Sequence, residues 1–405
     1  MKKCLALVCG LLAAAIGVYA QPPAAAVYGQ ADFTSSQANR GGPASAETLN
    51  YPLGLLVDGA GGLYVADRNN HRVLYFAPDG DTVADHVYGQ HGDLTAHIVN
   101  NDGSGNSGGA SANNLAMPTG IVLDSAGGLF VADRDNRRVL YFAPDGDTTA
   151  DRVYGQYGNF NTNMINNDGS GNYGEPGREN FSAFILGITI DSQDGLYVSD
   201  SASHRILYFA NDGDTVADRV YGQWDTFTSG VRNNDGDGRI GPANARSLNF
   251  PRGLAVDASD GLYVADRDNN RILYFANDGD TVADRVFGQY DNLDSNVPAN
   301  DGSGASGAPS VQNLIQPKAV VVDASSGIWI ADSLQHRILY FANDGDTVAD
   351  RVFGQAGSFT TGAVNANGGP GPETFSLPQG LALDAAGQLY VSDTGNNRVL
   401  VIPGG

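Results

Sequence analysis

Cysteine is missing from this chain beyond position 9, because both cysteines, Cys4 and Cys9, lie close to the N-terminus. Residues 1–20 combine two lysines, a short apolar run and a Val18-x-Ala20 ending, which is typical of a secretory signal peptide. We expect removal of this segment, and the remaining residues 21–405 then have no thiol. Their composition excludes disulfides and thiol chemistry. The folded protein must therefore be held together by its core.

Long apolar runs are also missing after residue 20, so the sequence predicts no membrane insertion. Basic residues are scarce as well. Without Lys2 and Lys3, 21 basic residues face 45 acidic ones, a net charge of −24. Such a charge repels nucleic acid and anionic lipid, which excludes both as partners. We expect a secreted protein, either extracellular or held in the periplasm or cell envelope.

Internal repetition is what the chain has in abundance. The patterns L/I-[YFW]-[VI]-[AS]-D and V-Y/F-G-Q each occur six times, the first at intervals of 61 to 67 residues. Each unit contains four short aromatic and β-branched segments bounded by Gly, Asn and Asp, which is typical of strands joined by hairpins. Because the segments are apolar on both faces, each small sheet must be covered on both sides. An all-β, six-bladed β-propeller with four antiparallel strands per blade meets this requirement better than a β-solenoid.

The acidic stretch NDGDTVADR, residues 211–219, and its close variants occur five times in all, although the other patterns occur six times. Its D-G step favours a turn between the third and fourth strands over a cation site. The sixth unit ends without a fourth strand, whereas residues 27–30 (VYGQ) are a spare fourth strand near the N-terminus. We predict that this N-terminal strand closes the last blade, so that residues 21–405 form one propeller domain without an exposed sheet edge.

The order [VI]-[AS]-D-x4-R-[VI]-L in all six units resembles the NHL repeat, as in VADRNNHRVL from Val65 and VSDTGNNRVL from Val391. The resemblance covers essentially residues 27–402 and implies the propeller fold. The resemblance does not imply a single function, because NHL domains include protein- or RNA-binding modules, extracellular sensor heads and a zinc-dependent amidating lyase. The chain has no metal-spaced histidine pair such as HExxH, and none of the six residues expected nearest the channel axis is histidine. The lyase reading is therefore disfavoured.

Two further positions recur in every unit. An Asp and an Arg five residues apart, as in Asp67 and Arg72, occur six times, which indicates a structural ion pair because a catalytic pair is needed only once. The turn residue before each Arg is His, Arg or Asn. It is histidine at His71, His204 and His336, for which turn packing is a better explanation than a ring of metal ligands.

Candidate ligand-binding residues are those that break the repeat near the axis. At the position of x in the P-x-G pattern, the six units have Leu53, Thr119, Leu186, Arg252, Lys318 and Gln379. Lys318 is the only lysine after Lys3. We expect Lys318 and Arg252 to hold a carboxylate or phosphate group at the channel mouth, with hydrogen bonds from Thr119 and Gln379. The alternative is that both cations neutralise nearby aspartates, such as Asp266 and Asp332.

Candidate calcium loops lie in the long connections between blades. In NNDGDGR, Asn233, Asp235 and Asp237 fall at positions one, three and five of an EF-hand-like loop, but the closing Glu is missing. The corresponding aspartates of the other connections are Asp102, Asp168 and Asp301. The sequence therefore offers weak Ca²⁺ sites as a hypothesis, against a plain Gly- and Asn-rich turn.

The function that fits these observations best is a binding module that uses its long-loop face. Its partner would be a protein, a glycan or a small anionic ligand. One alternative is a small-molecule lyase or lactonase with its site at the channel mouth, although the sequence contains no recognisable catalytic set. Another is a structural surface or matrix protein whose loops calcium stabilises.

Overall fold

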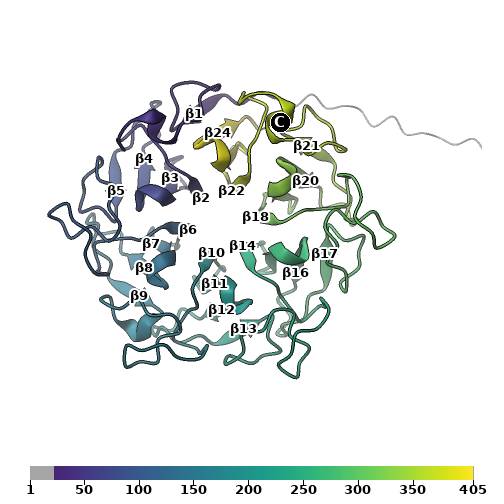
Figure 1. Ribbon diagram of the computed structural model, residues 1–405, viewed down its shortest axis with the longest axis horizontal. Helices are drawn as coiled ribbons and strands as arrows, with labels where there is room; N and C mark the ends of the chain where they lie inside the picture. Colours follow the sequence, from purple (N-terminus) through teal and green to yellow (C-terminus); the bar gives the residue numbers. More distant parts are fainter. Residues whose placement is uncertain (1–21, 405) are drawn as a thin grey trace, which may run out of the picture.

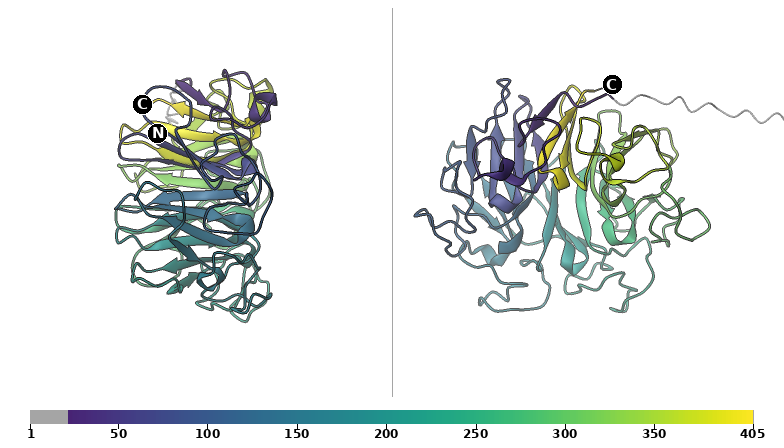
Figure 2. Two further views of the ribbon diagram at one scale, coloured as in Figure 1. Left: turned by 90° about the vertical axis from the view of Figure 1, so that its left-hand side faces the viewer. Right: turned by 45° about the horizontal axis from the view of Figure 1, so that its top comes forward.

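The computed structural model describes residues 22–404, and the expected signal peptide lies outside the described residues. Six four-stranded antiparallel sheets surround a central axis, which confirms the predicted six-bladed β-propeller (Figure 1). Seen from the side, the strands run along this axis (Figure 2). Within residues 22–404 there is no α-helix, only short 3-10 turns, and none of these has the length and apolar character needed to span a bilayer.

The strands of each blade follow one another in the chain. Blade 1 contains β2 (Pro52–Val57), β3 (Leu63–Asp67), β4 (Arg72–Phe76) and β5 (His86–Tyr88). Blade 2 contains β6 (Pro118–Leu123), β7 (Leu129–Asp133), β8 (Arg138–Phe142) and β9 (Arg152–Tyr154). Blade 3 contains β10 (Ile185–Ile190), β11 (Leu196–Asp200), β12 (Arg205–Phe209) and β13 (Arg219–Tyr221).

The second half of the ring repeats this order. Blade 4 contains β14 (Pro251–Val256), β15 (Leu262–Asp266), β16 (Arg271–Phe275) and β17 (Arg285–Phe287). Blade 5 contains β18 (Pro317–Val322), β19 (Ile328–Asp332), β20 (Arg337–Phe341) and β21 (Arg351–Phe353). Blade 6 contains β22 (Pro378–Leu383), β23 (Leu389–Asp393), β24 (Arg398–Ile402) and β1 (Ala26–Tyr28).

The first strand of each blade lines a central channel, and neighbouring first strands approach one another very closely. A Cβ added at Gly54 would lie 2.2 Å from the carbonyl oxygen of Thr119, and one at Gly380 would lie 1.9 Å from that of Leu53. A larger residue would therefore push two blades apart. These glycines set the width of the channel at the level where the first strands begin.

The core consists of apolar layers between adjacent blades, because both faces of each sheet are apolar. Between blades 6 and 1, for example, Val399 and Val401 pack in the same buried cluster as Val65 and Leu74. The outer strands contribute an edge-to-face contact between the aromatic residue of V-Y/F-G-Q and the phenylalanine that ends the third strand of the next blade. One such pair is Tyr28 and Phe76, whose ring centroids are 5.1 Å apart.

The ring closes as predicted. Strand β1 pairs antiparallel with β24, with Ala26 opposite Val401 and Tyr28 opposite Val399, so blade 6 combines three C-terminal strands with one N-terminal strand. In Figure 2 the two strands, purple and yellow, lie side by side. The missing sixth copy of the acidic hairpin is thus the place where the ring is open in the covalent chain.

A buried ion pair joins the second and third strands of every blade. In blade 1, Arg72 donates from Nε to Asp67 at 2.8 Å, and neither side chain is exposed to solvent. Its Nη2 donates to the carbonyl oxygens of Thr48 and Ser45, which precede the blade, and its Nη1 donates to that of Leu94, which follows it. All six pairs have N–O distances of 2.7–2.8 Å and no exposure, and their arginines are Arg72, Arg138, Arg205, Arg271, Arg337 and Arg398.

Each arginine therefore fastens the incoming and outgoing long connections to its own blade. In the last blade, Arg398 bonds the carbonyl oxygens of Gly371 and Thr374 before the blade and of Phe33 after β1. The expectation of a structural ion pair is confirmed. In blade 1, burial raises the pKa of Asp67 and the charge of Arg72 opposes this rise, so the pair is stable only when both members are present.

Closure predicts that deleting residues 22–30 will lower the melting temperature and cause self-association. The deletion exposes the edge of β24 and the ring of Phe76. Thermal denaturation and size-exclusion chromatography would measure both effects. A shortened protein that remains monomeric with an unchanged melting temperature would contradict the closure.

The ion pair predicts that Arg138→Met will reduce the free energy of unfolding by about 3–5 kcal/mol, because Asp133 is left buried without its partner. The matched control is Arg239→Met. Arg239 forms an ion pair with Asp237 at 3.7 Å but its side chain is 76 % exposed, so the expected loss is below about 1 kcal/mol. Urea denaturation would compare the two variants, and equal losses would argue against the role of the buried pair.

Candidate functional site: a basic cavity at the channel mouth

One end of the channel opens into a cavity of about 210 Å³, which we call the mouth cavity. Five basic side chains line it, namely Arg68, Arg134, Arg252, Arg267 and Lys318. The other lining residues are aromatic, aliphatic or amide, namely Tyr51, Leu53, Phe184, Leu186, Phe250 and Gln379, and no carboxylate is among them. The cavity is thus strongly electropositive in a chain whose net charge is −22.

The repeat supplies these cations from two positions. Arg252 and Lys318 follow the prolines that begin β14 and β18, so the first strands carry them to the mouth. Arg68, Arg134 and Arg267 each follow the buried aspartate that ends a second strand, at the start of the turns η2 (Arg68–Asn70), η3 (Arg134–Asn136) and η6 (Arg267–Asn269).

The sequence analysis predicted the cations of the first strands, Arg252 and Lys318, but not the three arginines of the turns. The signal was present, because blades 1, 2 and 4 read V-A-D-R whereas the other three blades have Ser201, Ser333 and Thr394 after the aspartate. Only the structure shows that both positions face the same end of the channel.

The three turn arginines are held over aromatic rings. The guanidinium carbon of Arg134 lies 4.2 Å from the ring centre of Phe184, and those of Arg267 and Arg68 lie 5.1 Å and 5.2 Å from Phe250 and Tyr51. Hydrogen bonds to Asp135, Gln316 and Asn69, respectively, hold each guanidinium further. The three cations are therefore ordered before any ligand arrives.

A hydrogen-bonded chain crosses the mouth from blade 4 to blade 1. Arg252 donates from Nη1 to Oε1 of Gln379 at 3.0 Å, and Gln379 donates from Nε2 to the hydroxyl of Tyr51 at 3.0 Å. Burial and the charges of Arg267, Arg68 and Arg134 lower the pKa of Arg252 to about 9. Part of this lowering is repulsion, since Arg267, Arg68 and Arg134 lie close enough to Arg252 for their charges to act on it.

Lys318 has no hydrogen bond or ion pair within residues 22–404 that would hold its ammonium group. Burial, followed by the charges of Arg252 and Arg267, lowers the pKa of Lys318 to about 7. The alternative role of neutralising Asp266 and Asp332 is not what the structure shows, because those carboxylates pair with Arg271 and Arg337. Lys318 and Arg252 thus face an open cavity.

Of the four residues predicted to bind a ligand, the structure brings three together. Gln379 lines the mouth cavity with Arg252 and Lys318. Thr119 lies instead in the channel wall, where its buried hydroxyl donates to the carbonyl oxygen of Ile185 at 3.1 Å. It joins blades 2 and 3 and is not placed to hydrogen-bond a ligand in the mouth cavity.

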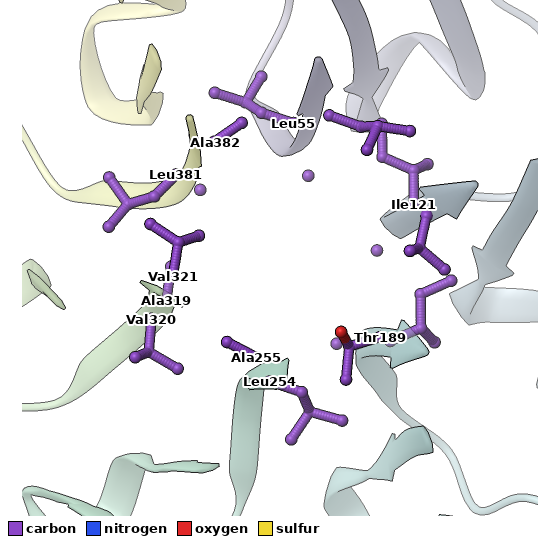
Figure 3. A pocket seen from close by; sticks show the side chains of 18 of the residues that line it. Leu55, Ile121, Thr189, Leu254, Ala255, Ala319, Val320, Val321, Leu381 and Ala382 are labelled. Atoms are coloured by element: carbon purple, nitrogen blue, oxygen red, sulfur yellow. The ribbon is translucent and has the colours of Figure 1, made fainter. Parts of the chain in front are cut away.

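Below the mouth the side chains that line the channel are mostly aliphatic, with Thr119 and Thr189 among them. The volume of the channel is about 310 Å³, and the first strands of all six blades line it. In Figure 3 the side chains of Thr189, Ala255, Val321 and Ala382 lie nearest the lumen, whereas those of Leu254, Val320 and Leu381 point away from it. A ligand in the mouth would therefore meet charge around its polar end and hydrocarbon beneath it.

The candidate calcium loops are hydrogen-bonded turns. Asp235 accepts from the backbone N–H groups of Asp237 and Arg239 at 2.9 Å and 3.1 Å, and these bonds, with that of Arg239 first, lower the pKa of Asp235. Asp102, Asp168 and Asp301 close equivalent turns. Asp237 lies apart from Asp235 in an exposed ion pair with Arg239.

The first asparagine of the NNDG motif has a different role from metal ligation. Asn233 exchanges two side-chain hydrogen bonds with Asn269, and Asn100 does the same with Asn136. The next asparagine, Asn234, donates to Gln223 of the preceding V-Y-G-Q. The structure therefore does not direct Asn233, Asp235 and Asp237 toward one point. No cluster of three or more His, Cys, Asp or Glu suited to a metal ion occurs in the described part of the chain.

The turn histidines join neighbouring blades. Nδ1 of His204 accepts a hydrogen bond from the backbone N–H of Phe250 in the next blade at 3.0 Å, and His71 and His336 make the same contact at 3.1 Å and 3.0 Å. Asn270 and Asn397 use Oδ1 in this role. Burial lowers the pKa of all three histidines, that of His204 to about 4. Only neutral histidine can accept this bond, so turn packing explains these residues.

Comparisons with known proteins agree with this architecture. The NHL repeat family matches residues 49–76, 115–142, 248–275 and 375–402, which span the first three strands of blades 1, 2, 4 and 6. The fold and these repeats define a β-propeller whose blades are built from one recurring motif. The chain is an NHL-repeat β-propeller protein.

Solved structures share the fold at low sequence identity. A gluconolactonase from Xanthomonas campestris is 13 % identical, with a TM-score of 0.50 over 94 % of this chain and 99 % of its own. A Bacteroides thetaiotaomicron protein of unknown function is 14 % identical, with a TM-score of 0.52 over 92 % and 72 %. A streptogramin B lyase is 13 % identical, with a TM-score of 0.48 over 93 % and 97 %. No curated protein matches the sequence.

The histidine contacts predict that the fold loses stability in acid. The pKa of His204 is lower in the folded state than its ordinary value of 6.5. Its contribution is therefore complete above about pH 6.5 and is lost as the pH falls toward 4. His204→Asn keeps an acceptor, as at Asn270, so its stability should match that of the wild type at pH 7.5.

At pH 5 the His204→Asn variant should be more stable than the wild type by about 1–2 kcal/mol, because it cannot become protonated. His86→Asn is the control, since His86 is exposed at the start of β5. Chemical denaturation at both pH values would measure the difference. A His204→Asn variant with the acid sensitivity of the wild type would contradict this role.

Proposed function

We propose that this protein is a binding module whose mouth cavity holds a small anionic ligand. The observation that carries the proposal is the convergence of five basic side chains from blades 1, 2, 4 and 5 on one cavity that no carboxylate lines. Clustering like charges costs free energy, and a bound anion offsets this cost. Such a site is of the kind that recognises carboxylate or phosphate groups.

The cavity also has the parts of a specific site. Arg252, Arg134 and Arg267 are held by hydrogen bonds or aromatic rings, so little side-chain entropy is lost when they bind an anion. Its volume of about 210 Å³ lies below the roughly 300–1,000 Å³ of sites for drug-sized ligands. The ligand is therefore a compact acid, with any apolar part directed into the channel.

Lyase or lactonase chemistry at the mouth is the alternative. The gluconolactonase shares the fold, but at 13 % identity that likeness carries no argument about activity. A purely structural role would account for Arg134 and Arg267, which pair with Asp135 and Asp268, but not for Lys318, which has no bonding partner among residues 22–404. We place the protein outside the cytoplasm, in line with the signal-like residues 1–20 and the absence of cysteine after them.

Calorimetric titration with citrate, oxalate and inorganic phosphate tests the proposal. At least one of these anions should bind, and Arg252→Gln should weaken binding about tenfold or more through the loss of a charge-assisted hydrogen bond. Arg239→Gln is the matched control, because its side chain is 76 % exposed on a connection and does not line the cavity. Binding of none of the anions, or equal losses in both variants, would overturn the proposal.

A further inference from the structure

Lys318 differs in kind from the four arginines around it. It lies on β18, it is the only lysine of the chain after Lys3, and its amine lines the cavity without a hydrogen-bonding partner among the described residues. The charged and titratable groups that face it are Arg252 and Arg267 of blade 4 and His336 of its own blade. None of these is an acid that would hold Lys318 as an ammonium ion.

This environment favours the neutral amine. An amine that is withdrawn from water and placed beside other cations loses its proton more readily, which is one of the ways in which proteins produce a nucleophilic lysine. Near neutral pH a large share of Lys318 is unprotonated, since its pKa is about 7. The guanidinium groups remain charged and cannot act as nucleophiles in its place.

We propose that Lys318 is a carbonyl-reactive amine that forms a reversible imine with a small 2-oxo acid bound in the mouth cavity. The inference rests on the proposed anion site, because Arg252 and Arg267 would hold the carboxylate next to the amine. A 2-oxo acid has its carbonyl one bond away from its carboxylate. The group that reacts with Lys318 is therefore adjacent to the group that the arginines bind.

The reaction balances without any further reagent. The lone pair of Nζ attacks the carbonyl carbon, and a proton moves from nitrogen to oxygen to give a carbinolamine. Loss of the hydroxyl group with the second amine hydrogen releases one water molecule and forms the C=N bond. The imine can take up a proton and then keeps the positive charge that the carboxylate faces.

The surroundings favour this chemistry over simple ion binding. Lys318 also borders the channel below the mouth, whose side chains are mostly aliphatic, so hydrocarbon lies on one side of the amine. The cavity of about 210 Å³ accommodates a short oxo acid. Ketones without a carboxylate would lack the contact that brings the carbonyl to Lys318.

Reductive trapping tests the proposal on the full chain. The protein is incubated with pyruvate and sodium cyanoborohydride at neutral pH, and peptide mass spectrometry locates the added carboxyethyl group. We expect Lys318 to be modified at least about tenfold faster than in the urea-unfolded protein, where its pKa is ordinary. Acetone should label it weakly, and lactate, which has the carboxylate but no ketone, should slow labelling by pyruvate.

Two variants separate the contribution of the Lys318 amine from that of the Arg252 charge. Lys318→Arg keeps a cation but has no nucleophilic amine, so it should abolish labelling at this position. Arg252→Gln removes one of the charges that lower the pKa of Lys318, so it should reduce labelling by both compounds. The reduction should be larger for pyruvate, because only pyruvate has the carboxylate that Arg252 would bind. Equal labelling by both compounds, or equal rates in the folded and unfolded protein, would overturn the proposal.

Calorimetry with pyruvate distinguishes failure of imine formation from failure of the anion site. Pyruvate that binds to the wild type without being trapped would refute imine formation and leave the anion site standing. Pyruvate, citrate, oxalate and phosphate that all fail to bind would refute both.

Discussion

The buried Asp–Arg pair is the interaction on which the rest of this structure depends. A propeller blade is too small to be stable alone, and the long connections of this protein would otherwise be loose. Each arginine ties one connection that enters its blade and one that leaves it to a carboxylate at the end of the second strand. Because the charges are buried without exposure, the backbone carbonyl partners are needed to offset desolvation. The pair therefore organises the same face of the ring on which the mouth cavity lies.

Symmetry and its interruption have separate roles in the molecule. The features that recur six times serve stability, namely the ion pair and the glutamine of V-Y/F-G-Q, which donates to a turn carbonyl oxygen. The aromatic contacts between blades serve it as well and occur five times, because the third strand of blade 6 ends in Ile402. What occurs in only some blades gathers at one end of the axis. Lys318 and Arg252 replace neutral residues, and three arginines replace the serine or threonine of the other blades. The first strands and the turns after the second strands all reach the mouth. A few substitutions in separate blades therefore form one compact site.

The fold could be predicted almost completely from the sequence, for a physical reason. Strand patterning, turn residues and the count of five hairpins against six strands are local signals, and ring closure is the arrangement that leaves no sheet edge unpaired. The site could be predicted only in part. Arg252, Lys318 and Gln379 break a repeat at a position whose direction follows from the strand order. Thr119 has the same position but uses its hydroxyl on the backbone of blade 3, which no local pattern indicates.

The acidic loops also show that residue spacing alone does not predict a site. The spacing of Asn233, Asp235 and Asp237 resembles a cation loop, but the fold pairs Asn233 with Asn269 and closes the Asp235 carboxylate on backbone amides. The sequence by itself determined the number of blades, their strands, the closure and the presence of unusual cations, because each depends on periodicity and composition. Only the tertiary structure decided which cations meet. Arg68, Arg134 and Arg267 come from blades 1, 2 and 4. Only the closed ring brings their turns to the cavity that Lys318 also lines.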